Sequence, residues 1–334
     1  MINNSTIFIT GGTGSFGKRL SKILLSKYKA KKIIIYSRDE LKQTEMQKEF
    51  ADLRTKTEIR FFLGDVRDLA RLKYAIKDAD ILVHAAALKH VPVAEYNPFE
   101  AVKTNIIGAQ NIISAALKKN VKRVVALSTD KACAPINLYG ATKLCSDKLF
   151  ISANNIKGKK NIKFSVVRYG NVFGSRGSVY NIFKEFKDKG FFPITDKKMT
   201  RFNITLDEGV RLVLETLNDS FGGEIIVPKL KSFKITELGT ALNKKNKFKI
   251  IGIRAGEKIH EQMISRSDSY STLEMKKKYV ILPKENKKIF QYYKKKFKAK
   301  NVKLDFEYSS DKNGKFLTTD NLKKIVSQHE NKRI

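Results

Sequence analysis

The sequence of 334 residues predicts an α/β protein with a doubly wound parallel sheet and a smaller C-terminal lobe. Up to about residue 170, short apolar runs alternate with helical patterns in units of about 25 to 30 residues. The first apolar run leads through a glycine-rich turn directly into a helical pattern, and beyond residue 170 the alternation loosens. We therefore expect a Rossmann-type domain over 1–170 and about 204–228. A second lobe and a C-terminal extension would then occupy 171–203 and 229–334.

The first predicted strand, residues 7–10, ends in a glycine turn. Its spacing is G-x-x-G-x-x-G, unlike the G-x-G-x-x-G of many dinucleotide-binding folds. Glycines let the backbone approach a pyrophosphate, whose charge is stabilised by the free N–H groups at the start of the next helix. We therefore predict that the turn binds a dinucleotide, through Gly11, Thr13, Gly14, Ser15, Phe16 and Gly17.

The second predicted strand, residues 32–36, is followed by Ser37 and Arg38. An enzyme that uses NAD usually has an acid here, which holds the ribose hydroxyls. Ser37 and Arg38 instead offer a hydroxyl and a guanidinium to a 2′-phosphate, so the sequence favours NADP. Asp39 and Glu40 are expected in the first turn of the next helix, where acids suit the helix dipole.

The third and fourth predicted strands, 59–63 and 80–84, also end in residues suited to a nucleotide. Asp65 and Val66 follow the third strand and are expected near the adenine. After the fourth strand, small residues let the backbone lie against a ribose and nicotinamide, and we assign this contact to Ala85 and Ala86.

Three polar side chains near the fourth strand have different expected roles. His84 lies beside a run of alanines, so we interpret it as a packed core residue. Lys89 is a better candidate for a ligand contact. Asn105 falls in a helical pattern, where a buried amide would brace the neighbouring strand end at the cofactor site.

The fifth predicted strand, 123–127, leads into Thr129, Asp130 and Lys131, at the sheet edge where ligands bind in doubly wound folds. Tyr139 and Lys143 follow at helical spacing i, i+4 and share a face. We expect the nearby ammonium to lower the tyrosine pKa, which makes the phenol a usable base for oxidising an alcohol.

Asp130 and Lys131 add an acid and an amine that simple alcohol oxidation does not need. Oxidising C4 of a sugar acidifies the hydrogen on C5. Lys131, with a lowered pKa, would remove that proton, and a protonated Asp130 would supply one to the leaving C6 hydroxyl. Thr129 supplies the hydroxyl that usually accompanies such a tyrosine.

The glycine turn 10–17 and the segment 139–143 look like those of extended short-chain dehydrogenase/reductases. More narrowly, the chain resembles the soluble, inverting UDP-N-acetylglucosamine 4,6-dehydratases that begin pseudaminic acid synthesis. The similarity runs from about residue 5 to 265. Its most specific stretches are 36–43, 87–92, 128–132, 146–150, 168–172, 174–179 and 256–258.

This resemblance implies that Asp130, Lys131 and Tyr139 are catalytic, with Lys143 as helper. It also implies NADP retained through turnover, with Val172 beside it, and inversion at C5. The second lobe would bind the UDP-sugar, through Lys89, Asn171, Arg176, Gly177, Ser178, Val179, Arg254 and Glu257.

Two positions depart from the family pattern: Asn203 replaces a usual tryptophan, and Ala134 replaces a larger polar residue. The segment after about residue 265 is only loosely similar. Two alternatives therefore stay open. One is a nucleotide-sugar 4-epimerase or 4-reductase of the same fold, and the other is a catalytically dead NADP-binding regulator.

The composition contains 67 Lys and Arg against 33 Asp and Glu, a net charge of +34. The lysines are scattered without a nucleic-acid motif, although eleven fall between Lys276 and Lys300, so we do not expect a nucleic-acid partner. We expect no metal site, membrane span or signal peptide, and the two cysteines make no disulfide framework. A cytoplasmic homo-oligomer, a dimer or hexamer, is expected, working towards a surface or flagellar glycan.

Overall fold

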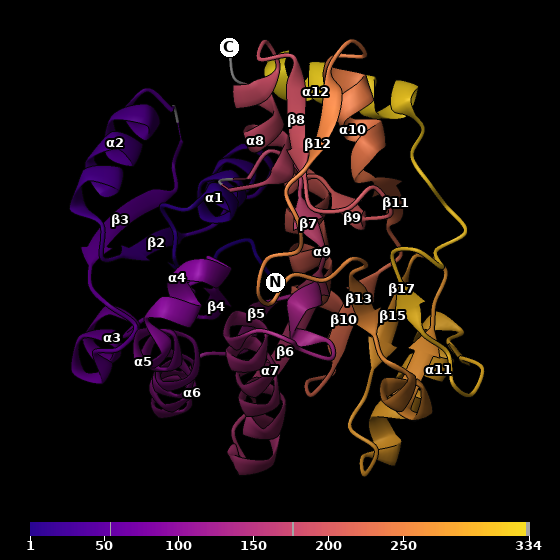
Figure 1. Ribbon diagram of the computed structural model, residues 1–334. Coiled ribbons are helices and arrows are strands. Elements are labelled where there is room, and N and C mark those ends of the chain that lie inside the picture. Colours follow the sequence, from indigo (N-terminus) through magenta and orange to yellow (C-terminus); the bar gives the residue numbers. More distant parts are fainter. Residues whose placement is uncertain (54, 176, 332–334) are drawn as a thin grey trace.

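The computed structural model describes residues 1–53, 55–175 and 177–331, and a ten-stranded sheet runs through it (Figure 1). Seven neighbouring strands are parallel, in the order β3-β2-β1-β4-β5-β6-β10. The chain reverses its direction of travel across the sheet between β1 and β4, where doubly wound folds bind ligands. These strands are β1 (Thr6–Thr10), β2 (Lys32–Ser37), β3 (Glu58–Leu63), β4 (Ile81–His84), β5 (Arg123–Thr129), β6 (Lys163–Tyr169) and β10 (Ile225–Pro228).

Helices cover both faces of the parallel strands, as the alternating pattern predicts. On one face α1 (Ser15–Lys27) packs against α9 (Leu206–Asp219). On the other, α6 (Gly108–Lys118) lies between α3 (Leu69–Ala75) and α7 (Leu138–Ile156). Because the sheet is covered twice, its central strands are buried on both sides; every residue of β1 and β4 is buried. The remaining elements of this half are α2 (Glu40–Ala51), α4 (Val91–Tyr96), α5 (Pro98–Val102) and a π-helical turn, Lys103–Ile107.

Smaller sheets form beyond β6. β9 (Thr200–Ile204) lies between β7 (Asn171–Val172) and β11 (Lys231–Lys234), and β8 (Phe191–Ile194) pairs with β12 (Lys247–Ile250). Phe202 and Ile204 of β9 belong to the core of the large sheet, but the buried apolar side chains of β8 and β11 form a second, separate core. Helices α8 (Val179–Phe186), α10 (Ile235–Leu242) and α12 (Thr319–Asn331) complete this core, so the last helix lies beside residues more than 80 positions earlier (Figure 1).

The range 229–334 divides between the two cores. Residues 272–301 extend the large sheet through antiparallel strands β15 (Lys278–Ile281), β14 (Thr272–Glu274) and β16 (Lys300–Asn301). Helix α11 (Lys287–Phe297) buries Ile289 and Tyr293 in the same core. Residue 229 therefore does not mark a division between the cores, because the apolar residues of these lysine-rich strands belong to the core of the large sheet. A further pair, β13 (Gln262–Ile264) and β17 (Tyr308–Ser309), joins 262–264 to the C-terminal region.

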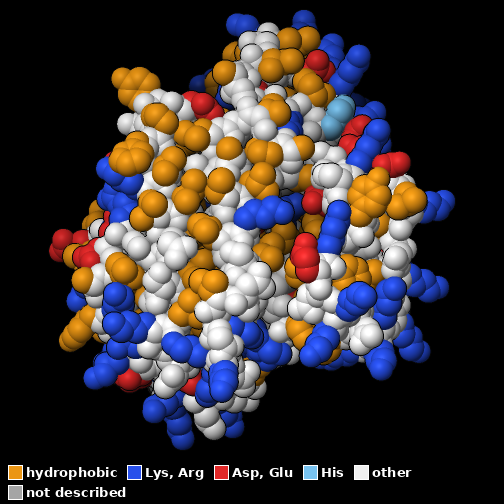
Figure 2. Space-filling model, turned by 90° about the horizontal axis from the view of Figure 1, so that it is seen from below, with side chains coloured by type: hydrophobic (Ala, Val, Ile, Leu, Met, Phe, Trp, Pro, Cys, Tyr) orange, Lys and Arg blue, Asp and Glu red, His pale blue; other side chains and the backbone are white. Residues whose placement is uncertain are grey.

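The surface carries the positive charge in dispersed form. Figure 2 shows lysines and arginines spread around the face seen from below, with hydrophobic side chains gathered to one side. In the part of the chain that the structure describes, no helix is both long and apolar enough to cross a membrane.

Candidate active site

Two cavities meet at the carboxyl ends of the parallel strands. The larger, of about 620 Å³, follows the ends of β1, β2, β4 and β5; the smaller, of about 220 Å³, opens toward the second lobe. They adjoin, because Thr129 and Val172 line the larger cavity while Lys131 and Asn171 line the smaller. A cofactor in one would therefore lie next to a substrate in the other.

The glycine turn forms one wall of the larger cavity. Gly11 has φ +62°, and a Cβ there would lie 2.9 Å from the backbone of Ala85, so both conformation and space require glycine. Gly17 packs more closely still, because a Cβ there would lie 2.4 Å from the Gly12 carbonyl oxygen. Gly14 offers no side-chain cap to α1, which leaves the first N–H groups of that helix to face the cavity. Of the predicted set, the residues that line the cavity are Gly11, Thr13, Gly14, Ser15 and Phe16.

Ser37 and Arg38 lie at the end of this cavity formed by β2. The Ser37 Oγ is 2.8 Å from Thr13 Oγ1, and Arg38 Nη1 is 3.6 Å from Asp65 Oδ2. Arg38 remains 59% exposed, and a surface ion pair of this kind is worth at most about 1 kcal/mol. Its guanidinium is therefore available to an anion. Asp39 caps α2 by accepting from the Lys42 N–H, which confirms the predicted helix start.

The residues after β3 and β4 also reach the larger cavity. Its lining includes Asp65, Val66, Ala85, Ala86 and Lys89. Lys89, expected to contact both cofactor and substrate, therefore lies on the cofactor side.

Asn105 lies behind the cavity wall. The side chain is 1% exposed; its Oδ1 accepts from Leu88 N at 2.8 Å, and its Nδ2 donates to Leu88 O at 2.9 Å. Its Nδ2 also donates to Thr142 Oγ1 on α7, at 3.0 Å. Asn105 thus braces the loop after β4 against α7, and its neighbour Thr104 lines the cavity.

His84 is a core residue, as predicted. It is 1% exposed, its Nδ1 lies 2.8 Å from Thr10 Oγ1, and its ring packs against Phe150. Burial, with a contribution from Lys143, lowers the pKa of His84 to about 3, so the ring is neutral near pH 7.

Tyr139 and Lys143 lie on the first turns of α7, whose start is fixed by the Asn137 side chain accepting from Gly140 N. Burial raises the pKa of Tyr139 to about 12, against the opposing effects of Lys131 and a hydrogen bond with Thr129. The expected lowering by Lys143 is therefore wrong. Lys143 is 3% exposed and has its own pKa lowered by burial, and the ammonium that acts on the phenol is that of Lys131.

Asp130 and Lys131 form a short 3₁₀ turn, Asp130–Ala132, at the end of β5. The Lys131 Nζ lies 3.1 Å from Asp130 Oδ1 and 2.9 Å from Oε1 of Glu261, which precedes β13. Burial and the Glu261 carboxylate raise the pKa of Asp130, as its predicted role as an acid requires. Burial alone would lower the pKa of Lys131, but the two carboxyl groups raise it above its ordinary value. The predicted lowering is wrong, because Glu261 was not foreseen.

Glu261 and two cations near it were missed by sequence reasoning. Arg201, on β9, is held by the carbonyls of Lys258 and Ile259, and its Nε lies 3.7 Å from Glu261 Oε1. The Lys258 Nζ donates to the carbonyls of Cys133 and Ala134, just after the turn Asp130–Ala132. Only the nearness of Glu261 to the segment 256–258 could have drawn attention to it.

The residues proposed for substrate are partly brought together. The smaller cavity is lined, beside Lys131, by Asn171, Gly177, Val179, Arg254 and Glu257. Ser178 is buried and is the N-cap residue of α8. The Glu257 carboxylate accepts a hydrogen bond from the Thr195 hydroxyl at 2.9 Å. Arg176 lies outside the described residues.

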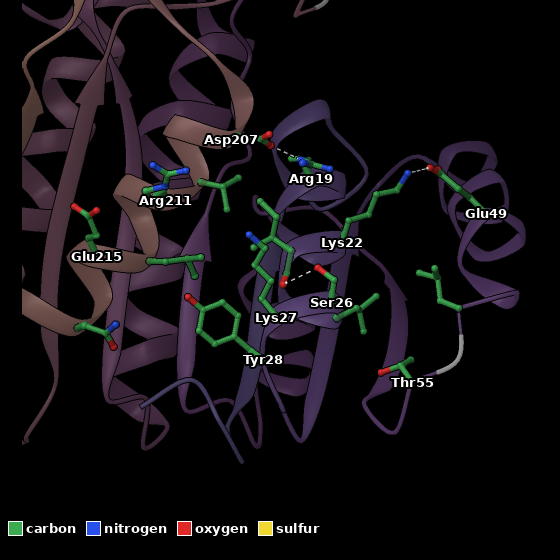
Figure 3. Close-up of a pocket in the computed structure, with 16 residues that line it drawn as sticks. Arg19, Lys22, Ser26, Lys27, Tyr28, Glu49, Thr55, Asp207, Arg211 and Glu215 are labelled. Carbon is green, nitrogen blue, oxygen red and sulfur yellow. Dashed lines mark hydrogen bonds and ion pairs between the residues drawn. The ribbon is translucent and has the colours of Figure 1, made fainter. Parts of the chain in front are cut away.

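A third cavity, of about 670 Å³, lies between α1 and α9 and shares no lining residue with the other two (Figure 3). Arg19 points toward Asp207 and Lys22 toward Glu49, each in an ion pair. Because it shares no lining residue with the two adjoining cavities, we do not assign this cavity to the candidate active site.

The fold and the site define a class. A glycine turn after β1, a parallel sheet in the order found here and a Tyr-x-x-x-Lys pair that lines the larger cavity are those of an extended short-chain dehydrogenase/reductase. Within this class, the chain belongs to the polysaccharide biosynthesis protein family, whose model matches residues 7–283.

Individual relatives differ in their activities. The chain is 53% identical to a UDP-N-acetylglucosamine 4,6-dehydratase (inverting) of Campylobacter jejuni, over 99% of both proteins. It is 41% identical to a UDP-glucose 4-epimerase of Rickettsia canadensis, over 80% of both. Among solved structures it is similar to Pen from Bacillus thuringiensis, with a TM-score of 0.89, 34% identity and 99% of both chains covered.

Proposed function

We propose that this protein is an NADP-dependent UDP-N-acetylglucosamine 4,6-dehydratase that inverts C5. The observation that carries the proposal is the pairing of the buried Asp130 carboxyl group with the partly exposed Lys131 ammonium where the two cavities adjoin, beside Tyr139. An epimerase needs only the hydride and the tyrosine. A second acid and amine at the same sheet edge are what removal of water requires.

The larger cavity would hold NADP and the smaller one the UDP-sugar. When bound, the nicotinamide supplies the acceptor for a hydride from C4 and later the donor of a hydride to C6. Ser37 and Arg38 support NADP over NAD, since Arg38 can bind a 2′-phosphate. Arg254 and Asn171, in the smaller cavity, suit a pyrophosphate and a polar sugar or uracil edge.

The side chains would then move protons around the sugar. Tyr139 takes the proton of the C4 hydroxyl as the ketone forms, after giving its own proton to solvent, because burial keeps the resting phenol neutral. Lys131, protonated at rest beside its two carboxyl neighbours, first releases a proton to solvent. The free amine then takes the C5 proton, and Asp130 gives its proton to the C6 hydroxyl, which leaves as water. A proton from solvent, added to C5 from the opposite face, completes inversion, and the product is a UDP-4-keto-6-deoxy-N-acetylhexosamine.

Incubation of the purified protein with UDP-N-acetylglucosamine in deuterated water, followed by NMR, tests this proposal. We expect a 4-keto-6-deoxy sugar with deuterium at C5. A 4-epimer as sole product would support the epimerase alternative. Absence of turnover with NADP bound would support the regulator.

We further propose that the enzyme acts in the cytoplasm as a homo-oligomer and begins synthesis of pseudaminic acid for flagellin or other surface glycans. Light scattering of the purified protein tests the oligomer. Loss of the nine-carbon sugar from surface glycans, after deletion of the gene, tests the pathway.

A further inference from the structure

Glu261 is a buried carboxylate that the proposed mechanism does not use. It is 2% exposed, lies immediately before β13 and lines the smaller cavity together with Lys131. Its backbone is fixed by Ser310, which accepts from Glu261 N at 2.9 Å and donates its own N–H to Glu261 O at 2.8 Å. A carboxylate placed so rigidly 2.9 Å from the Lys131 ammonium is not a surface ion pair.

We infer that Glu261 is a positioning residue of the proposed dehydratase. Its carboxylate fixes Lys131 beside Asp130. Of the two carboxyl groups, that of Glu261 is ionised and that of Asp130 carries the proton. The inference rests on the proposed function, because it concerns how that site keeps an acid ready.

The two carboxyl groups, those of Asp130 and Glu261, differ in the cations that lie near them. Glu261 faces Lys131 at 2.9 Å and Arg201 at 3.7 Å, whereas the one cation paired with Asp130 among the described residues is Lys131. Two carboxyl groups that share one ammonium in a buried site repel each other when both are ionised. The negative charge therefore stays on Glu261, which has more positive charge near it, and the proton stays on Asp130.

Hydrogen bonding leaves room for that proton. Asp130 Oδ1 accepts from Thr129 Oγ1 at 3.0 Å and from Lys131, while its Oδ2 is buried and bonded to none of the described residues. Oδ2 is thus the oxygen that can carry a proton without losing an existing bond. Glu261 Oε2 is also buried without a partner among these residues, but its Oε1 is the atom nearest both cations.

Other titratable groups around the pair do not reverse this assignment. Tyr139 of α7 and the Cys133 thiol are held neutral, since burial raises the pKa of each to about 12. Lys258 adds positive charge on the side of Glu261. Glu257 lies 3.9 Å from Arg201 and is hydrogen-bonded to Thr195, so it sits beyond Arg201 and is not in contact with Asp130. The shifts agree with the geometry: the pKa of Glu261 is lowered, although burial opposes this, and that of Asp130 is raised.

Glu261→Gln tests the inference through the pH dependence of dehydration. Removing the carboxylate removes a negative charge from both neighbours, so the pKa of Asp130 and that of Lys131 should fall together. We expect the acidic and alkaline limbs of the kcat profile to move to lower pH by about one unit or more. We also expect kcat to fall on the order of a hundredfold, because Lys131 loses its anchor.

Glu224→Gln is the matched control. Glu224 is another fully buried carboxyl group, bonded to Ser165 at the junction of β6 and β10 and absent from the lining of either site cavity. This variant should keep the wild-type limbs. A lower kcat in Glu261→Gln with unmoved limbs would mean a merely structural role and would overturn the inference.

A second measurement needs no folded variant at position 261. Carboxyl carbon NMR of the wild-type protein, with the signal of Asp130 assigned through Asp130→Asn, should show Asp130 titrating above the ordinary range for an aspartate. An Asp130 signal that titrates below that range would contradict the inference even if Glu261→Gln failed to fold. Failure of the wild-type protein to form any keto sugar would instead refute the proposed function.

Discussion

The larger cavity is lined by short segments that each follow one strand of the sheet, whereas the acid–base network joins segments far apart in the chain. Gly11, Ser37, Asp65 and Ala85 all lie within a few residues of a strand end. Lys131 and Glu261, by contrast, are 130 positions apart and meet only because β13 passes beside the turn after β5. The larger cavity, which we call the cofactor half of the site, is therefore encoded locally. The acid–base network, which we call the acid–base half, depends on how the two lobes pack.

The two halves also differ in charge. The framework of the cofactor half consists of neutral groups, namely a glycine turn, a buried neutral histidine and an amide brace, and its Arg38–Asp65 ion pair lies at the surface. The acid–base half contains two carboxyl groups and two cations, which form a chain in which each group lies within 4 Å of the next. Substitutions in the cofactor half should alter cofactor binding and stability, and substitutions in the acid–base half should alter the pH profile and the chemical step.

The largest effect is expected for Lys131→Met, which removes the amine at the centre of the network. We expect kcat for dehydration to fall by on the order of 10³-fold, because no other described amine lies within hydrogen-bonding distance of Asp130. The rate of deuterium incorporation at C5 measures it, and NADP affinity should be unchanged. Lys148→Met, at an exposed position of α7, is the control. Normal dehydration by Lys131→Met would show that Lys131 is not the base.

Gly11→Ala should act on the cofactor half alone. A non-glycine residue at φ +62° costs about 1–2 kcal/mol, and the new Cβ would lie 2.9 Å from the Ala85 backbone. We expect NADP affinity to fall about 10- to 100-fold by calorimetry, with unshifted limbs in the kcat profile. Gly158→Ala has the same sign of φ, +58°, but nothing within 4 Å of the new Cβ. If both variants bound NADP as the wild type does, the turn would not be the pyrophosphate site.

His84 should make the stability of the cofactor half sensitive to acid. Its pKa is about 3 when folded and has an ordinary value near 6.5, so above pH 6.5 both states are neutral and nothing changes. Below pH 6.5 the unfolded chain binds a proton that the folded chain excludes, and stability is lost. Between pH 7 and 5 the loss should be about 2 kcal/mol. Denaturant titrations of wild type and His84→Gln measure it, with His260→Gln as control. An equal loss in His84→Gln would assign the sensitivity to other groups.

Much of the cofactor half could be predicted from the sequence, because its signals are local. The spacing of Gly11 to Gly17 and the i, i+4 relation of Tyr139 and Lys143 are visible within seven residues. The partners of Lys131 could not be predicted, since no local pattern links residue 131 to Glu261 or Arg201. For the same reason the pKa directions of Lys131 and Tyr139 were expected wrongly: each depends on burial and on charges brought from elsewhere.

The short strands β14 and β15 were missed on different physical grounds. Each has only three or four residues, and the lysines around them hide the apolar positions Leu273 and Val280. Pairing of β15 with β10, and of β14 with β15, places them in the large sheet, and no sequence pattern of their own does so.

The smallest effect is expected for Arg38→Met, which tests the choice between NADP and NAD. Arg38 is 59% exposed and shares its charge with Asp65, so its bond to a 2′-phosphate should be a moderate one. A charge-assisted hydrogen bond is worth about 1.5–3 kcal/mol, and exposure brings this toward the lower limit, or about tenfold in affinity. NADP binding should weaken by that factor while NAD binding stays constant, both measured by calorimetry.

Arg60→Met, at a partly exposed arginine of β3 outside the cavity lining, is the matched control for Arg38→Met. Equal weakening of NADP and NAD by Arg38→Met would mean that the guanidinium supports the loop after β2 and reads no phosphate. Unchanged NADP binding would leave Lys42, which lines the same end of the cavity, as the cation that meets the 2′-phosphate. In either case the locally encoded half would still form the cofactor site, but its preference for NADP would not come from the residue at the end of β2.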